Sequence, residues 1–169
     1  MAGSKNAQVT ASKVLSVLQT GWDAKVAALN TSYDDGILLV SPDAWHQAPQ
    51  RAYGQALSVV VVAAPMERDY QGSERLNGQS VLIGLVVGGN AAVGDYSPQE
   101  VVTIMLWRYA EAVTEILETN HTLTIDSVSW ADELLVTGFE PSVQAADETE
   151  PGYEQRMLIT TMLITSEIE

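Results

Sequence analysis

The sequence predicts an α+β fold, a single domain over residues 1–169 in which two helices pack on one side of an antiparallel or mixed β-sheet of four or more strands. Two long stretches have apolar residues at every third or fourth position, the spacing of amphipathic helices. Short apolar and β-branched runs separate and follow these stretches, as expected of strands. With 169 residues and 46% hydrophobic side chains, the chain can enclose one core. The expected element order is α-β-β-α-β-β.

The first helix is expected to begin at Thr10 or Ser12, either of which can cap it, and to run to about Asn30. Residues 1–9, ahead of the cap, are expected to be disordered. Large apolar residues recur along one face of this helix, namely Val14, Leu18, Trp22, Val26 and Leu29.

The first pair of sheet strands is expected over residues 57–64 and 80–87. The run 57–64 is apolar at nearly every position, which predicts a strand covered on both faces. Between the two strands, residues 66–79 are polar and charged, and we expect an extended loop or arm longer than the usual hairpin link. Ahead of the pair, a short strand over residues 36–40 and an irregular loop over 41–56 are expected.

The second helix is predicted over residues 97–118. Ser97 is a favoured N-cap residue, Pro98 suits the first helical position, and Glu100 can complete a capping box. Thr119 and Asn120 end the helix. Its apolar face comprises Val102, Met105, Leu106, Tyr109, Val113, Ile116 and Leu117.

The last third of the chain is predicted to form two further strands. Residues 122–128 alternate and are rich in β-forming residues, and strand character resumes over 134–139. Residues 141–153 form a second acidic excursion, expected to be an extended loop or arm. The run 155–165 is the clearest β-branched stretch of this part and predicts the closing strand.

The net charge of −14 is concentrated in the second part of the chain. Residues 1–99 have 8 acidic and 6 basic side chains, whereas residues 100–169 have 14 and 2. Binding to nucleic-acid phosphates needs a basic patch, for which the chain has little material. The acidic surface therefore either keeps the protein soluble or repels a polyanion or meets a basic partner.

No motif predicts catalysis or a cofactor. The chain has no cysteine, which excludes disulfides, thiol nucleophiles and thiolate metal sites. His46 and His121 have no carboxylate or second histidine at metal-ligand spacing, and the glycine-rich run 88–94 lacks the lysine of a phosphate loop. No apolar run approaches the length of a membrane span. We therefore expect a non-enzymatic protein that needs no metal, nucleotide or organic cofactor and meets no membrane.

The succession of elements resembles that of the tail terminator and neck (head-tail joining) proteins of long-tailed bacteriophages. The likeness rests on element order and character over nearly the whole chain: the N-terminal amphipathic helix, the hairpin 57–87 with its long charged connection, the capped helix 97–118, and the closing pair 122–139 and 155–166. Residues 36–56 are longer than we expect of a minimal member, which leaves a neighbouring neck role open.

The resemblance implies a structural virion protein of the tail or neck, made in the cytoplasm of a host bacterium. Members form hexameric rings that stop growth of the tail tube and join it to the head connector. The implied partners are other copies of the chain, the tail tube protein and a head connector or adaptor protein. DNA would pass through such a ring without tight binding, since carboxylates repel phosphates.

The ring hypothesis selects two sets of candidate residues. Contacts with neighbouring subunits or partners are expected from the two long excursions, at Glu67, Arg68, Asp69, Tyr70, Glu74, Arg75, Asp147, Glu148 and Glu150. Acidic residues on the exposed face of the second helix, Glu111, Glu115 and Glu118, are expected to face the channel. Two alternatives stand beside the terminator: a head-completion or connector adaptor of the neck, and, from a different class, a small-molecule-binding or enzymatic α+β domain with no recognisable site.

Overall fold

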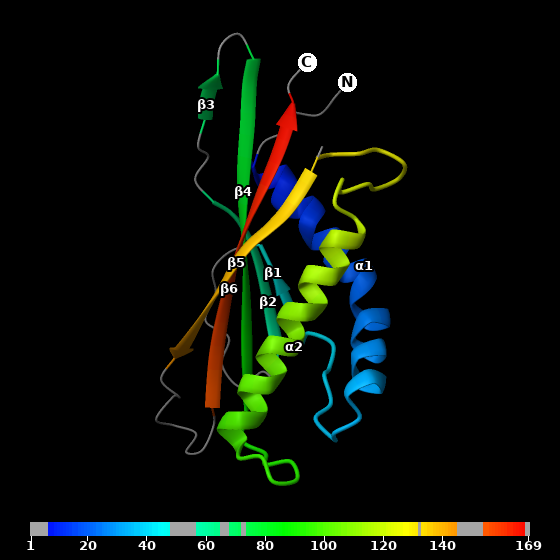
Figure 1. The fold of residues 1–169 in the computed structure, drawn as a ribbon, viewed down its shortest axis with the longest axis vertical. Coiled ribbons are helices and arrows are strands. Elements are labelled where there is room, and N and C mark those ends of the chain that lie inside the picture. The colour runs from blue at the N-terminus through cyan, green and yellow to red at the C-terminus, as the bar shows by residue number, and fades with distance from the viewer. Residues whose placement is uncertain are drawn as a thin grey trace.

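Two helices cover one face of a long, twisted β-sheet in the computed structural model (Figure 1). The structure describes residues 7–47, 57–64, 68–71, 74–131, 133–144 and 154–167. Along the chain the elements are α1 (Ala7–Tyr33), β1 (Ala44–His46), β2 (Leu57–Ala63), β3 (Arg68–Gln71), β4 (Glu74–Gly89), α2 (Pro98–Thr119), β5 (Glu133–Gln144) and β6 (Glu154–Glu167). The α+β class and the two helices on one side of the sheet agree with the sequence prediction.

The sheet is mixed and has six strands in the order β1-β2-β4-β6-β5, with β3 paired to β4 beyond the end of β2. β1 runs parallel to β2, and every other pair is antiparallel. The predicted order α-β-β-α-β-β is therefore incomplete. It omits two short strands between the helices, β1 and β3. The strand predicted over residues 57–64 is confirmed as β2.

The core lies between the helices and the sheet. Val59 and Val61 of β2 and Ile83 and Leu85 of β4 alternate along their strands, face the helices and are inaccessible to solvent. This alternation is the two-residue period of a pleated strand. From the helical layer, Trp22 of α1 stacks on Tyr109 of α2, with ring centroids 5.9 Å apart. Burial raises the pKa of Tyr109 to about 12.

The predicted start of α2 is confirmed. The Ser97 backbone N–H donates to Glu100 Oε2 at 2.8 Å, and the Glu100 N–H donates to Ser97 Oγ at 3.4 Å. This reciprocal pair is the capping box, which satisfies two donors that the first turn leaves unpaired. At the other end, Asn120 is the C-cap, in agreement with the predicted stop.

Within the extended loop or arm predicted over residues 66–79, the described residues 68–71 and 74–79 form strands and not a loop. β3 and the first part of β4 form a hairpin in which Arg68 pairs with Asn77 and Gln71 with Glu74. With 16 residues, β4 is roughly 50 Å long at about 3.3 Å per residue. It therefore extends past the helical layer, and the hairpin lies at its far end (Figure 1). We call β3 and residues 74–77 of β4 the projecting hairpin.

The strand predicted over residues 122–128 is also wrong. Leu123, Asp126 and Ser127 have positive φ angles, which a strand does not allow. Asp126 and Ser127 instead form a two-residue turn, since Ile125 and Val128 exchange both backbone hydrogen bonds, at 3.0 Å. β-forming composition was therefore an unreliable guide in a segment that only connects α2 to β5.

The segment predicted as a strand over residues 36–40 belongs to no sheet. Side chains satisfy its backbone groups: Asn30 Oδ1 accepts from the Leu39 N–H at 2.8 Å, and the Tyr109 hydroxyl accepts from the Val40 N–H at 2.9 Å. Ile37 and Leu39 are buried without any strand partner. An apolar run can thus be buried as an irregular segment when helical side chains replace the ladder of hydrogen bonds.

Other predicted boundaries shift. α1 begins at Ala7, ahead of the predicted caps, so residues 7–9 are helical and the prediction of disorder there is wrong. β1 lies inside the loop predicted over 41–56, of which residues 48–56 lie outside the described residues. Residues 141–144 belong to β5, and the rest of the predicted arm 141–153 lies outside the described part. Within the described residues, no helix is long and apolar enough to span a bilayer.

Candidate assembly interface

The projecting hairpin brings five of the predicted contact residues together. Arg68, Asp69 and Tyr70 lie on β3, and Glu74 and Arg75 lie on β4, where Arg75 is the partner of Tyr70. Glu67, Asp147, Glu148 and Glu150 lie outside the described residues.

The register of the hairpin separates its residues by charge. Tyr70 pairs with Arg75, so strand alternation places Arg68, Tyr70 and Arg75 at positions that share one face. Asp69, Gln71 and Glu74 occupy positions on the other face. Along β4, Arg75 is in phase with Val81 and Ile83, which face the helices. By strand phase, the positions of the two arginines therefore belong to the helix side of the sheet.

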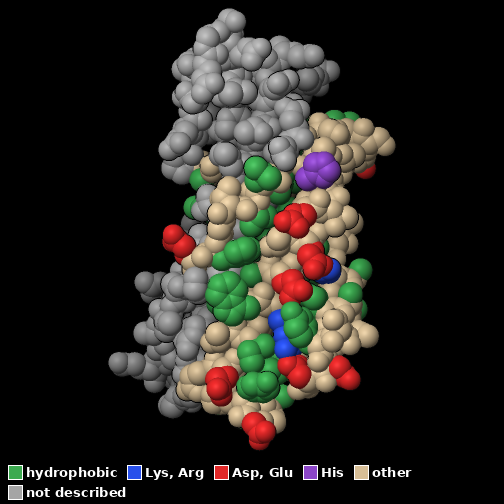
Figure 2. Space-filling view, viewed as in Figure 1, with side chains coloured by type: hydrophobic (Ala, Val, Ile, Leu, Met, Phe, Trp, Pro, Cys, Tyr) green, Lys and Arg blue, Asp and Glu red, His purple; other side chains and the backbone are tan. Residues whose placement is uncertain are grey.

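A half-exposed aromatic surface lies where α2 meets β5. Trp107 of α2 is 48% exposed and meets Phe139 of β5 edge to face, with centroids 6.5 Å apart. On the opposite face of β5, Leu135 is 52% exposed. Figure 2 shows hydrophobic side chains gathered along this boundary, with carboxylates beside them on α2. We call Trp107, Phe139 and Leu135 the α2–β5 surface.

β5 forms one edge of the sheet. Within the described residues it pairs with β6 alone, so its outer edge has no partner strand. A bulge between Val136 and Gly138 interrupts the register. The segment from Leu134 to Phe139 has no charged residue, although natural edge strands are commonly protected by charge or proline.

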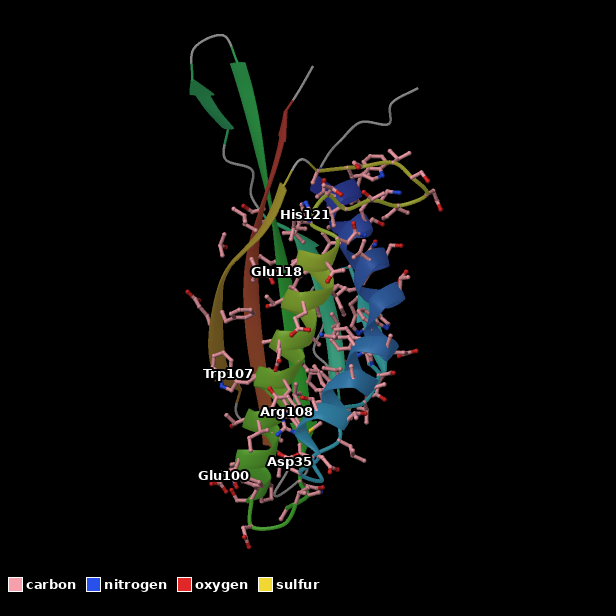
Figure 3. All side chains as sticks on the ribbon, turned by 45° about the vertical axis from the view of Figure 1, so that its right-hand side comes forward. Asp35, Glu100, Trp107, Arg108, Glu118 and His121 are labelled. Atoms are coloured by element: carbon pink, nitrogen blue, oxygen red, sulfur yellow. The ribbon has the colours of Figure 1, made fainter. Side chains whose placement is uncertain are left out.

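The three acidic residues predicted to face a channel lie on the exposed side of α2 but differ in their contacts. Glu111 accepts a hydrogen bond from the Tyr33 hydroxyl at 2.6 Å, which raises the pKa of Tyr33. Glu115 is ion-paired with Lys25 of α1. Glu118 is exposed, one turn below His121 (Figure 3). The structure thus ties two of the three to α1.

An ion pair that the sequence did not reveal holds the turn after α1 against α2. Arg108, only 8% exposed, points from α2 toward Asp35, and its Nη1 donates to Asp35 Oδ1 at 2.9 Å and to the Ile37 carbonyl at 3.3 Å (Figure 3). Its guanidinium also lies over the Tyr33 ring, 3.9 Å from the centroid. The hydrogen bonds from Arg108 lower the pKa of Asp35 from 3.8 to about 2.

This pair predicts a pH-dependent contribution to stability. Because the pKa of Asp35 is lower in the folded chain, the contribution is present above about pH 4 and is lost as the pH falls toward about 2. Asp35→Asn should lower the urea midpoint at neutral pH, and its difference from the parent should shrink with acidification over that window. Asp34→Asn, a neutralisation one residue away, is the matched control. A difference independent of pH would contradict the ion pair.

A groove of about 630 Å³ separates the outer sides of α1 and α2. Gly21 and Ile116 line it where the helices are close together, since a Cβ on Gly21 would lie 3.0 Å from Ile116 Cγ2. Lys25 and Glu115 form their ion pair at its wall. Among the described residues, no group of three or more histidines and carboxylates is close enough to hold a metal ion.

The sequence matches no known family model and no curated protein. The candidate site is therefore defined by its geometry. The sequence shows a tryptophan at position 107 but does not show whether it is buried. The placement of β5 shows that Trp107 is half-exposed and packs against Phe139.

Proposed function

We propose that this chain is a structural protein of a bacteriophage tail, a tail terminator that assembles into a ring, caps the tail tube and joins it to the head connector. The observation that supports this most is the projecting hairpin, which extends past the helical layer of its own chain (Figure 1). A segment of this kind is suited to contact a neighbouring molecule.

The sheet also has two unlike edges, as a ring requires. A closed ring is built from heterologous contacts, in which one patch of each subunit meets a different patch of the next. Here β5 forms one edge, and the outer side of β3 forms part of the other. The resemblance to terminator and neck proteins gives this assembly its proposed place at the end of a tail tube.

The charge of the described surface suits a passage for DNA. The three described cations with side-chain contacts are engaged within the chain: Lys13 lies over the Trp130 ring, Lys25 pairs with Glu115, and Arg108 pairs with Asp35. The net charge of −14 would repel a duplex that passes nearby.

The test is assembly on tail tubes. The purified chain should form a ring, expected to be a hexamer, by native mass spectrometry, either alone or after mixing with tail tubes that lack a terminator. Electron microscopy should show the ring at one end of the tube, and capped tubes should stop growing and become competent to join heads. Chains that bind only to the head connector would favour the adaptor role. Chains that stay monomeric beside bare tubes would rule out the ring.

One observation favours a different class. The groove between α1 and α2 is large enough for a small ligand and has charged groups, Lys25 and Glu115, at its wall. A monomer that keeps a stoichiometric small molecule through purification, detected by mass spectrometry, would support this reading in place of the terminator.

A further inference from the structure

We propose that β3 of one copy adds to the outer edge of β5 in the next copy, so that the sheet continues from subunit to subunit around the assembly. This inference rests on the proposed ring and assigns its interface. The acceptor is the β5 edge with the α2–β5 surface, and the donor is the projecting hairpin.

Both edges are open in the described chain. Among the described strands, β1 covers the outer side of β2, none covers the outer side of β3, and β5 pairs with β6 alone. A strand added to β5 would lie beside Phe139 and Trp107 on one face and beside Leu135 on the other. Main-chain hydrogen bonds and burial on both faces are what strand addition uses.

Strand direction agrees with this pairing. From β3 through β4 and β6 to β5, each strand is antiparallel to its neighbour. β3 and β5 therefore run in opposite directions. When a second copy is placed edge to edge with the same side facing the helices, its β3 meets β5 as an antiparallel partner, and the alternation continues unbroken.

Charge agrees as well. In a continuous sheet, the hairpin face at Arg68, Tyr70 and Arg75 falls on the helix side of the neighbour. That is the side on which α2 presents Trp107 and the carboxylate Glu118 (Figure 3), with Glu111 between them in the sequence. The pairing would thus place the positions of the two hairpin arginines beside an acidic, aromatic surface. This complementarity identifies the occupant as a second copy of this chain.

The pairing requires neighbours to be staggered along the strands. β3 pairs with residues 74–77 of β4, whereas β5 begins at the level of residue 78, as Gly78 and Glu133 both pair with Thr165. β3 must slide by several residues to lie beside the uncharged segment of β5. Strands that tilt from the axis of a closed sheet show this kind of stagger.

Disulfide trapping tests the contact. The chain contains no cysteine, so an introduced thiol can bond only with another introduced thiol. Gly138 is exposed and an added Cβ would meet nothing within 4 Å, so Gly138→Cys introduces a thiol at the β5 edge without strain. Asp69→Cys and Gln71→Cys place thiols on β3, on the same side of the sheet as Gly138. Since a disulfide requires Cα atoms within about 7 Å, bonding reports direct adjacency.

Oxidised mixtures of full-length Gly138→Cys with either β3 variant should give a disulfide-linked heterodimer, and a chain with both changes should give a ladder up to the ring. Ala91→Cys, exposed between β4 and α2, is the control thiol and should not link to Gly138→Cys. Rings that form without a mixed disulfide, or Gly138→Cys linking to itself above the control level, would overturn the strand pairing and leave the ring intact. A chain that stays monomeric beside tail tubes overturns both proposals.

Discussion

Replacing Trp22 with alanine should lower the free energy of unfolding by about 4 kcal/mol, the scale found for large aromatic residues deleted from cores. Trp22 is 1% exposed and joins three parts of the chain. It stacks on Tyr109 of α2 and meets Trp45 of β1 edge to face, with centroids 5.3 Å apart. The cavity would therefore lie between both helices and the edge of the sheet. In thermal unfolding, the midpoint should fall by about 10 °C for a chain of this size.

Trp107→Ala is the matched control for this loss. It removes the same side chain from a position that is 48% exposed, so we expect a cost within about 1 kcal/mol. Trp22→Phe, which keeps an aromatic ring against Tyr109, should fall between the two. Equal midpoints for Trp22→Ala and Trp107→Ala would show that the stack is not the centre of the core.

The parts of the fold that the sequence predicted are those in which local chemistry and burial agree. The capping box at Ser97 and Glu100 and the apolar face behind it define α2 without reference to the rest of the chain. β2 was predictable because a run of Val59 to Val62 between helices suits a buried strand.

The parts that the sequence did not predict depend on partners distant along the chain. The projecting hairpin is polar, and β4 continues into it because β6 pairs with β4 from Gly89 to Leu76. Residues 36–40 have the composition of a strand, but Asn30 and Tyr109 take their hydrogen bonds. In both cases tertiary context overrides local propensity.

The candidate interface shows the same division. The hairpin residues were predicted as contacts from the length and charge of the segment 66–79. Their separation into a basic and an acidic face became visible only from the pairing of Tyr70 with Arg75. The three carboxylates of α2 looked equivalent in sequence. The contacts of Glu111 with Tyr33 and of Glu115 with Lys25 became visible only when α1 was placed beside α2.

Reversing the charge of the hairpin face should abolish assembly while the subunit stays folded. In Arg68→Glu/Arg75→Glu, two carboxylates would replace the arginines that the proposed pairing places beside the acidic side of α2, and like charges at an interface cost several kcal/mol. We expect the association constant to fall at least ~30-fold, the equivalent of about 2 kcal/mol. Sedimentation velocity and native mass spectrometry measure this loss, and circular dichroism with thermal unfolding reports the fold.

Two further variants make this result specific to the proposed contact. Asp69→Lys/Glu74→Lys changes the same number of charges on the other face of the hairpin, and it should leave assembly in place. Adding Glu118→Lys to the arginine reversal should restore part of the association, because each subunit then offers a basic α2 surface to the acidic hairpin of its neighbour. Added salt should weaken the parent contact, since exposed ion pairs are screened. If the arginine reversal assembles like the parent, or if Glu118→Lys restores nothing, the hairpin does not bind beside α2 and the charge of the second part of the chain only keeps the protein soluble.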